Sequence, residues 1–328
     1  MTSQTARSLR ASAAMIGATL FWAVHYQLSA FVLQGMSAVG LTFWRWAIAA
    51  VPLLILAQLI EHPDWRAVVR ALPRLVVLAL LGLVGYNLLL YAALHFTTPV
   101  GASLVNAANP ALMVLLSVVL VGQRVSKAGV LGIGLSLVGV VVVLTRGSWQ
   151  TLAGLDFNVG QLIMLGAILV WSLYTIYGRV PGVRPITSTA VQAVLVCVML
   201  GPFAVVQQAG LPLEAPGTLW GLIVIALLPS VASYLLWNSA VSVVPSSTAA
   251  IYLNLITVFV VLIGLALGQP LTVSAALGGI LIIAGVVITS FAAARRGTLA
   301  QTAQTAQTAQ TAQTAQPSVD DGAADHRK

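Results

Sequence analysis

Long apolar segments recur along the whole chain, each close to the length that crosses a lipid bilayer. A helix that spans the hydrocarbon core needs about 20 mostly apolar residues, and these segments are continuously apolar rather than alternating, which excludes a β-barrel. The polar or Gly/Pro breaks between them are short, so neighbouring helices must run antiparallel in a bundle. We predict an all-α membrane protein with ten transmembrane helices, over residues 12–33, 41–60, 74–95, 100–121, 128–145, 160–178, 187–207, 218–240, 246–267 and 271–293.

The composition excludes a water-soluble globular protein. Apolar residues make up 59% of the 328 and charged residues only 7%, whereas about a quarter of an average globular chain is charged. The net charge of +8 does not indicate a nucleic-acid-binding protein, because the basic residues are spread among the loops. The single cysteine, Cys197, excludes an intramolecular disulfide and a thiolate metal cluster. Because apolar segments recur throughout, one secretory signal peptide does not explain them.

The distribution of basic residues predicts that both termini lie in the cytoplasm. With the N-terminus inside, 13 of the 15 Lys and Arg residues fall on the cytoplasmic side, Arg146 falls outside, and Arg45 lies within a span. Loops rich in Lys and Arg are retained in the cytoplasm, and the opposite orientation would reverse the tally. We therefore expect a multi-pass protein of the bacterial inner membrane.

The two halves of the chain resemble one another at an offset of about 147 residues. The sequence GATLFW at 17–22 recurs as GAILVW at 166–171, and other short matches follow in the same order. Each half holds five spans, an odd number, so the second half enters the membrane from the opposite side; such inverted repeats suit a site that opens alternately to either face. The predicted units are a cytoplasmic N-terminus (1–11), a first five-helix repeat (12–147), a periplasmic linker (148–159), a second five-helix repeat (160–294) and a disordered cytoplasmic tail (295–328) that contains Gln-Thr-Ala repeats.

These features resemble the drug/metabolite transporter superfamily, and within it the EamA-type transporters. The resemblance rests on two five-helix halves, on Trp22 and Trp171 in the first helix of each half, and on a glycine-rich fifth helix in each half. It covers residues 12–147 and 160–293. The glycine-rich fifth and tenth helices carry no polar stripe, and we expect them to pack closely against neighbours.

One detail resembles a particular branch of the family. The turn that usually reads Leu-Gly-Glu has Gln123 in the first half and Gln269 in the second. Together with Asn106 and Pro110 in the fourth helix, this glutamine looks more like the bacterial aromatic amino acid exporters. The resemblance implies efflux of amino acids or similar metabolites.

Polar and aromatic side chains form stripes on single helix faces inside otherwise apolar spans. Trp22, His25 and Tyr26 share a face of the first helix, and the repeat-related positions in the sixth helix carry similar residues. Asn87, Tyr91 and His95 share a face of the third helix, and their repeat equivalents in the eighth helix again share one face. Hydrogen bonds between helices and interfacial aromatic belts are the structural alternatives. Because lipid disfavours polar faces, we expect a shared central cavity. The predicted substrate-binding residues are Trp22, His25, Tyr26, Asn87, Tyr91, His95, Asn106, Asn109, Trp171, Tyr174, Tyr234, Trp237, Asn238 and Asn254.

Pro110 is the predicted gate or hinge. It lacks an N–H, so it frees the carbonyl of Asn106 and kinks the fourth helix beside the amides of Asn106 and Asn109. A bent helix next to a polar site is a plausible moving part, and a purely structural kink is the alternative.

The predicted spans contain no Asp or Glu, and Arg45 is the sole charged residue inside one. Coupling to protons would therefore fall on His25 or His95, so we expect facilitated diffusion, with histidine-coupled export of drugs or metabolites as the alternative. Arg45 lies near the outer end of the second helix, where its long side chain can reach water. It is expected to anchor the helix at the interface, or else to attract a substrate carboxylate at the outer mouth.

The sequence gives little support for catalysis. It contains no Walker loop, no Gly-x-Ser-x-Gly elbow and no His-Glu-x-x-His pair. We expect a non-enzymatic exporter of aromatic and other neutral amino acids or related small metabolites that works by alternating access. It would need no cofactor and no metal, bind no nucleic acid, contact membrane lipid and act as a monomer. An intramembrane enzyme or a non-transporting receptor is the remote alternative.

Overall fold

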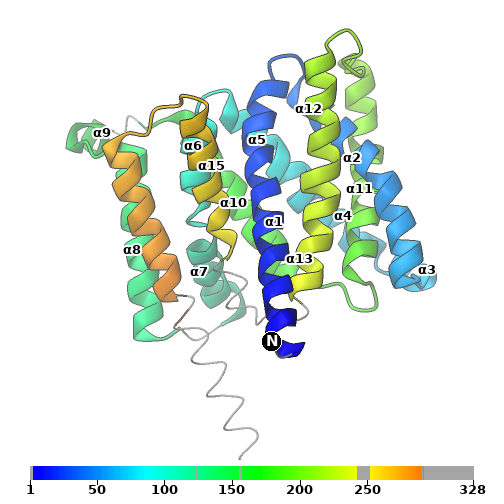
Figure 1. The fold of residues 1–328 in the computed structure, drawn as a ribbon, viewed down its shortest axis with the longest axis horizontal. Helices are drawn as coiled ribbons and strands as arrows, with labels where there is room; N and C mark the ends of the chain where they lie inside the picture. The colour runs from blue at the N-terminus through cyan, green and yellow to red at the C-terminus, as the bar shows by residue number, and fades with distance from the viewer. Residues whose placement is uncertain (1–2, 123–124, 155–156, 242–251, 290, 292–328) are drawn as a thin grey trace, which may run out of the picture.

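The computed structural model is a bundle of helices (Figure 1), and it describes residues 3–122, 125–154, 157–241, 252–289 and 291. No strand occurs in these residues, as the sequence predicts. In chain order the labelled elements are α1 (Ser3–Val32), α2 (Ala38–Leu56), η1 (Ala57–Glu61), α3 (Trp65–Arg70), α4 (Leu72–Leu78), η2 (Ala79–Gly85), α5 (Tyr86–Leu94), α6 (Pro99–Asn106), α7 (Asn109–Val121), α8 (Lys127–Thr145), α9 (Trp149–Gly154), α10 (Val159–Tyr177), α11 (Pro185–Val206), α12 (Pro216–Leu227), η3 (Leu228–Ala232), α13 (Ser233–Val241) and α15 (Leu255–Ala266).

Several of these elements join into continuous membrane-length helices. Eight helical stretches are long and apolar enough to span a bilayer, and two shorter apolar helices, Leu255–Ala266 and Val273–Thr289, follow them. The chain is thus a multi-pass membrane protein. The predicted ninth and tenth spans reach into 242–251 and beyond 289, which lie outside the described residues, as do Gln123 of the predicted turn and the predicted tail.

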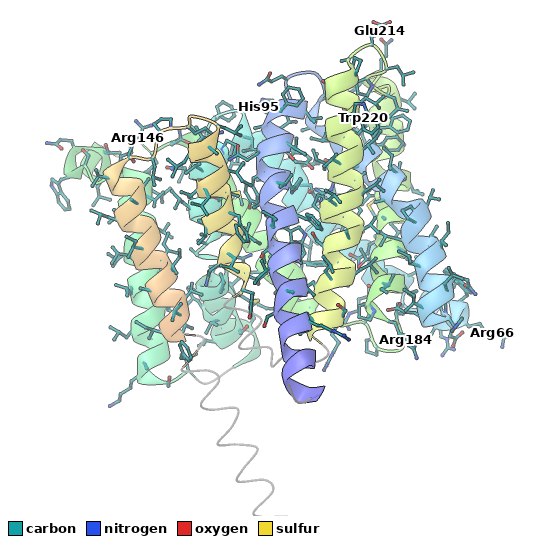
Figure 2. All side chains as sticks on the ribbon, in the orientation of Figure 1. Arg66, His95, Arg146, Arg184, Glu214 and Trp220 are labelled. Carbon is teal, nitrogen blue, oxygen red and sulfur yellow. The ribbon has the colours of Figure 1, made fainter. Side chains whose placement is uncertain are left out.

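Apolar and charged side chains are distributed over the surface of the bundle as in a membrane protein. Large apolar side chains such as Val119, Val198 and Trp220 are exposed along its sides, where lipid would contact them. In Figure 2 the labelled charged residues lie at the ends, with Arg66 and Arg184 at the end that holds the start of α1, and Glu214 at the opposite end.

The third and eighth membrane helices each contain a π-helical segment at matching positions. These segments, η2 and η3, end at Gly85 and Ala232, which are 147 residues apart. In η3 the cause is local: Pro229 has no N–H to bond the carbonyl of Ile225, and the hydroxyl of Ser230 donates to that carbonyl instead, at 2.9 Å. Such π-turns shift the register of the residues that follow and often mark functional sites.

The two halves of the chain pack mainly against each other. Helix α1 contacts α13 and α15, α10 contacts α5 and α7, and α2 lies along α11. In Figure 1 α1 stands next to α12 and α13, and α8 lies beside the helix Val273–Thr289, drawn in orange. The interface between the two halves therefore involves helices from most of the bundle.

Glycines bring α8 and the helix Val273–Thr289 into backbone contact, as expected for the fifth and tenth helices. A Cβ atom added to Gly139 would lie 2.7 Å from the carbonyl oxygen of Gly278, and one added to Gly132 would lie 2.5 Å from that of Gly285. The hydroxyl of Ser136 donates to the carbonyl of Ile282 at 3.0 Å across the same contact. Close approach of this kind is what small residues allow between membrane helices.

Candidate functional site

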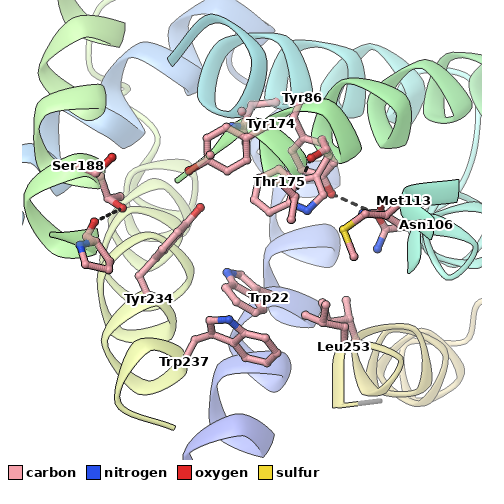
Figure 3. A pocket seen from close by; sticks show the side chains of 18 of the residues that line it. Trp22, Tyr86, Asn106, Met113, Tyr174, Thr175, Ser188, Tyr234, Trp237 and Leu253 are labelled. Atoms are coloured by element: carbon pink, nitrogen blue, oxygen red, sulfur yellow. Dashed lines mark hydrogen bonds between the residues drawn. The ribbon is translucent and has the colours of Figure 1, made fainter. Parts of the chain in front are cut away.

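A cavity of about 690 Å³ lies between helices of both halves (Figure 3). Residues of α1, α2, α5, α7, α10, α11, α13 and α15 contribute to its wall. Most of the residues predicted for the site lie in this wall, namely Trp22, His25, Tyr26, Asn87, Asn106, Asn109, Pro110, Trp171, Tyr174, Tyr234, Trp237 and Asn254. The stripes on separate helices therefore meet around one space.

Aromatic rings of α1 and α13 form one wall of the cavity. The ring of Trp22 lies edge-on to Tyr234, with centroids 5.9 Å apart, and 5.5 Å from the ring of Trp237. Its indole N–H donates to the carbonyl of Pro229 in η3 at 3.1 Å. The π-turn thus supplies the acceptor that fixes Trp22 in place, and Figure 3 shows the three rings gathered on one side.

A second aromatic group comes from α5 and α10. The ring of Trp171 lies 4.9 Å from Tyr86 and 5.1 Å from Tyr174. Gly82 in η2 leaves room for this group, because a Cβ atom there would lie 2.6 Å from Cε2 of the Tyr174 ring. Aromatic walls of this kind offer flat apolar surface with few polar edges, which suits a ligand with an apolar or aromatic body.

Arg45 lies in the cavity wall and not at the membrane interface. Its side chain is only 4% exposed, so the expectation that it snorkels to water at the outer end of its helix is wrong. Its Nε donates to the Ser230 hydroxyl at 2.7 Å, and Nη1 donates to Asn87 Oδ1 at 2.6 Å. These partners belong to η3 and α5. The side chain of Arg45 therefore points into the bundle, where buried acceptors bond it.

His25 and Tyr91 complete the group around Arg45. The Nε2 atom of His25 lies 2.7 Å from Nη1 of Arg45 and 3.0 Å from the Tyr91 hydroxyl. A guanidinium has only donors, so Nε2 must accept, which requires a neutral imidazole that carries its proton on Nδ1. The local geometry therefore holds His25 uncharged beside a cation.

Two predicted site residues, Tyr91 and His95, are described but do not line the cavity. Tyr91 is fully buried behind the wall, where its hydroxyl accepts from Nη1 of Arg45 at 3.1 Å. His95 lies one helical turn beyond Tyr91, just after the last residue of α5. It is therefore exposed at the end of the bundle, where Figure 2 labels it. The side chain of Asn238 lies outside the described part of the chain.

The fourth membrane helix breaks at the predicted hinge. Helix α6 ends at Asn106 and α7 begins at Asn109, with Pro110 in its first turn, where a missing N–H costs nothing. Asn109 Oδ1 accepts from the hydroxyl of Ser172 in α10 at 2.9 Å. In the ninth helix, Asn254 precedes α15, and its amide nitrogen and oxygen are buried with no hydrogen-bond partner among the described residues.

The wall also contains residues that the sequence reasoning missed. Tyr86 directly precedes Asn87 and turns its ring into the cavity, and its hydroxyl lies 3.0 Å from that of Tyr26. Ser230 is not a lining residue but bonds Arg45, and it was missed although Pro229 beside it marks an irregular helix. For Arg45, the one indication of a role in the sequence was a charged side chain within an apolar span.

The cavity continues to the end of the bundle where α10 passes into α11. Gly178, Arg179 and Pro185 line it there, and Arg179 is exposed. The described lining residues include Arg45 and Arg179 but no Asp or Glu. Within the described ranges no group of three or more His, Cys, Asp or Glu side chains is placed to hold a metal ion.

Similar proteins agree with a membrane transport role. The chain is 29% identical over 280 residues to the uncharacterized transporter YyaM of Bacillus subtilis, covering 84% of this chain and 92% of that protein. It is 28% identical to the probable terminal-alkyne amino-acid exporter of Streptantibioticus cattleyicolor, over 84% and 91% of the two chains. Over 30% of this chain and 34% of the other, it is 33% identical to the aromatic amino acid exporter YddG of Ancylobacter novellus.

The fold is also similar to that of a solved crystal structure, with a TM-score of 0.57 and 21% sequence identity over 89% of this chain and 99% of the other. The EamA-like transporter family matches the chain twice, over residues 9–145 and 158–291. Together the two matches cover nearly all of the membrane-embedded helices. The chain therefore belongs to the EamA-like transporter family, and it is a transporter rather than an enzyme.

Proposed function

We propose that this protein exports amino acids, aromatic and other neutral ones, or related small metabolites across the bacterial inner membrane. The observation that carries the proposal is the central cavity, whose walls combine aromatic rings with the amides of Asn87, Asn106 and Asn254. Such walls suit small amphipathic molecules with an apolar body. The amino-acid exporters among its relatives support the same substrate class.

Alternating access between two inverted repeats is the proposed mechanism. At the repeat offset of 146, Gly132 corresponds to Gly278 and Gly139 to Gly285. In the bundle Gly132 approaches Gly285, and Gly139 approaches Gly278. Such an exchange of partners is the pattern that a two-fold axis produces, so these contacts support two halves related by a pseudo-two-fold axis. The double match to the family supports the same division of the chain.

The proposed orientation makes this conformation open to the cytoplasm. The cavity runs to the end of the bundle that holds Arg179, and in Figure 2 the start of α1 and Arg184 lie at one end. The positive-inside rule assigns these basic residues to the cytoplasm, with both termini on that side. A second state, in which the cavity opens outward, would complete the transport cycle.

Facilitated diffusion is the proposed driving mode. A proton on Nε2 of His25 would place a second cation 2.7 Å from the guanidinium of Arg45 and remove the acceptor that now bonds it. His25 is therefore a poor proton carrier, and His95 is outside the cavity. The exporter would move its substrate down the substrate's own gradient.

Counterflow in proteoliposomes tests the proposal. Purified protein in liposomes preloaded with unlabelled L-phenylalanine is expected to take up labelled L-phenylalanine, and an imposed pH difference alone should drive no accumulation. Replacing Trp237 with Ala should slow this flux about two- to tenfold, because one aromatic wall contact is lost. Trp220→Ala is the matched control, since that ring is 66% exposed on the outer surface.

Two results would contradict the proposal. If wild-type protein exchanges no amino acid or related metabolite, export through this cavity is wrong. If a pH difference alone drives accumulation against the substrate gradient, facilitated diffusion is wrong and the histidine-coupled alternative takes its place.

A further inference from the structure

We propose that the cavity recognises its substrate by a carboxylate group, which Arg45 binds, and that an α-amino group is not required. The substrate class is then small monocarboxylates with an apolar or aromatic body, of which neutral amino acids are one part. The inference depends on the proposed function only in taking the cavity as the substrate site.

The charge of Arg45 has no counter-ion in the described part of the chain. Its guanidinium is bonded by Ser230, Asn87, His25 and Tyr91, all of them neutral groups. Neutral acceptors replace some of the lost hydration, but they do not cancel a buried charge. A buried cation without a partner is therefore a site that an anion would stabilise.

The acidic residues of the described structure are all engaged or distant. Glu61 accepts hydrogen bonds from the backbone N–H groups of Ile186 and Thr187 at the start of α11. Asp64 caps α3 by accepting from the N–H of Arg66 at 2.9 Å. Glu214 is exposed at the opposite end of the bundle (Figure 2). Since none of these carboxylates pairs with Arg45, the described structure supplies no counter-ion, and we assign that role to the ligand.

The guanidinium still has donors available on the cavity side. Its described hydrogen bonds use Nε and Nη1, and no acceptor among the described residues bonds Nη2. Arg45 lines the cavity, and the planar fork of a guanidinium matches the two oxygens of a carboxylate. The amide of buried Asn254, which has no hydrogen-bond partner among the described residues, lines the same cavity and offers the ligand a further donor and acceptor.

The remaining residues of the cavity wall indicate the charge and polarity of the rest of the ligand. Apart from Arg45, the described lining is aromatic, amide, hydroxyl or aliphatic, and it holds no second buried cation. The other cation of the lining, Arg179, is exposed at the mouth, where it would attract anions. One deep cation matches the single charge of a carboxylate better than the double charge of a phosphate monoester. Because the described lining holds no acid, it provides no fixed charge for an ammonium group.

The second half of the protein carries an uncharged residue at the position that corresponds to Arg45. The repeat equivalent of Arg45 is Gln192, which is 1% exposed and donates to the Ser188 hydroxyl at 2.9 Å. A buried glutamine is thus accommodated at the corresponding place in the opposite half. Arg45→Gln is therefore a natural test variant, because it removes the charge but keeps a long polar side chain.

Binding measurements on the purified full chain in detergent test the inference, with three probes of nearly equal shape. Isothermal titration calorimetry would compare 3-phenylpropionate, L-phenylalanine and 3-phenylpropanamide, the uncharged amide of the first. Both carboxylates should bind to wild-type protein at least about tenfold more tightly than the amide, since the amide has no negative charge and only one acceptor oxygen for the guanidinium. In Arg45→Gln this preference should disappear.

The wild-type comparison keeps the inference testable even where the variant does not fold. Equal binding of the amide, or no binding of either carboxylate, would overturn it, and so would an unchanged preference in folded Arg45→Gln. Binding of L-phenylalanine more than about tenfold tighter than 3-phenylpropionate would show that the amino group is required. Carboxylate-selective binding without counterflow would leave this site assignment standing and refute the proposed export.

Discussion

Ser230 links the irregular turn of η3 to the charged group in the cavity wall. Its hydroxyl accepts from Arg45 Nε at 2.7 Å and donates to the Ile225 carbonyl that Pro229 leaves free. The residue thus satisfies a buried cation and a buried backbone acceptor with one oxygen. Removing a fully buried hydroxyl that makes two such hydrogen bonds is costly, because each of its partners loses a bond.

Ser230→Ala is accordingly expected to lower the free energy of unfolding by about 1.5–3 kcal/mol, the range for hydrogen bonds to charged groups. Thermal unfolding in detergent, followed by tryptophan fluorescence, would measure the loss. Ser117→Ala is the control, because among the described residues that hydroxyl bonds only the Met113 carbonyl in its own helix, at 2.8 Å. A Tm for Ser230→Ala equal to that of the control would refute the role assigned to Ser230.

At the same scale, the sequence predicts single residues well only where a helical stripe carries the information. The stripe of Trp22, His25 and Tyr26 predicts the α1 side of the cavity, since residues on one helix face stay together whatever that face contacts. Arg45 could not be placed in this way, because its partners Asn87 and Ser230 are 42 and 185 residues away. Only the packed bundle brings those acceptors to it.

Two glycines of α8 differ in their importance for its contact with the helix Val273–Thr289. Gly139 faces the backbone of Gly278 and Ile282, whereas a Cβ atom on Gly134 in the same helix would meet nothing within 4 Å. One glycine is thus needed for the helix contact and the other is not. The pair provides a matched comparison within one helix.

Gly139→Ala should therefore destabilise the protein, by about 1–3 kcal/mol as for other overpacked cores, because the added methyl group meets backbone atoms that cannot turn aside. Gly134→Ala should be neutral or stabilising by up to about 1 kcal/mol, since alanine favours a helix. Thermal unfolding of both variants measures the difference. Equal destabilisation would mean that the close contact between the two helices is absent.

Elements differ in how far the sequence predicts them. Membrane helices follow from apolar length alone, and α6 and α7 from the proline at residue 110. The π-turns do not follow, because in an almost wholly apolar span a shift of register leaves no mark on the hydrophobic pattern. Pro229 is the one local cause of η3 that the sequence displays, and no comparable residue marks η2.

For the whole molecule, the arrangement of the two halves is what makes the cavity. Aromatic walls come from the pairing of α1 with α13 and of α10 with α5, which joins the first half to the second on both sides. An internal repeat in the sequence predicts two similar units, but it does not predict which helices of one unit contact the other. If the halves rock against each other, the same walls would face each side of the membrane in turn.

Cysteine labelling in membrane vesicles tests this alternation most directly. Asn106→Cys, in a chain whose single native cysteine is removed by Cys197→Ala, places one thiol at the helix break in the cavity wall. Val119→Cys, on an apolar side chain that is 71% exposed, controls for lipid-facing positions and should stay unlabelled. A membrane-impermeant maleimide should react with the Asn106→Cys thiol in both right-side-out and inside-out vesicles, and L-phenylalanine should slow the reaction. Labelling from one side only would contradict alternating access through this cavity.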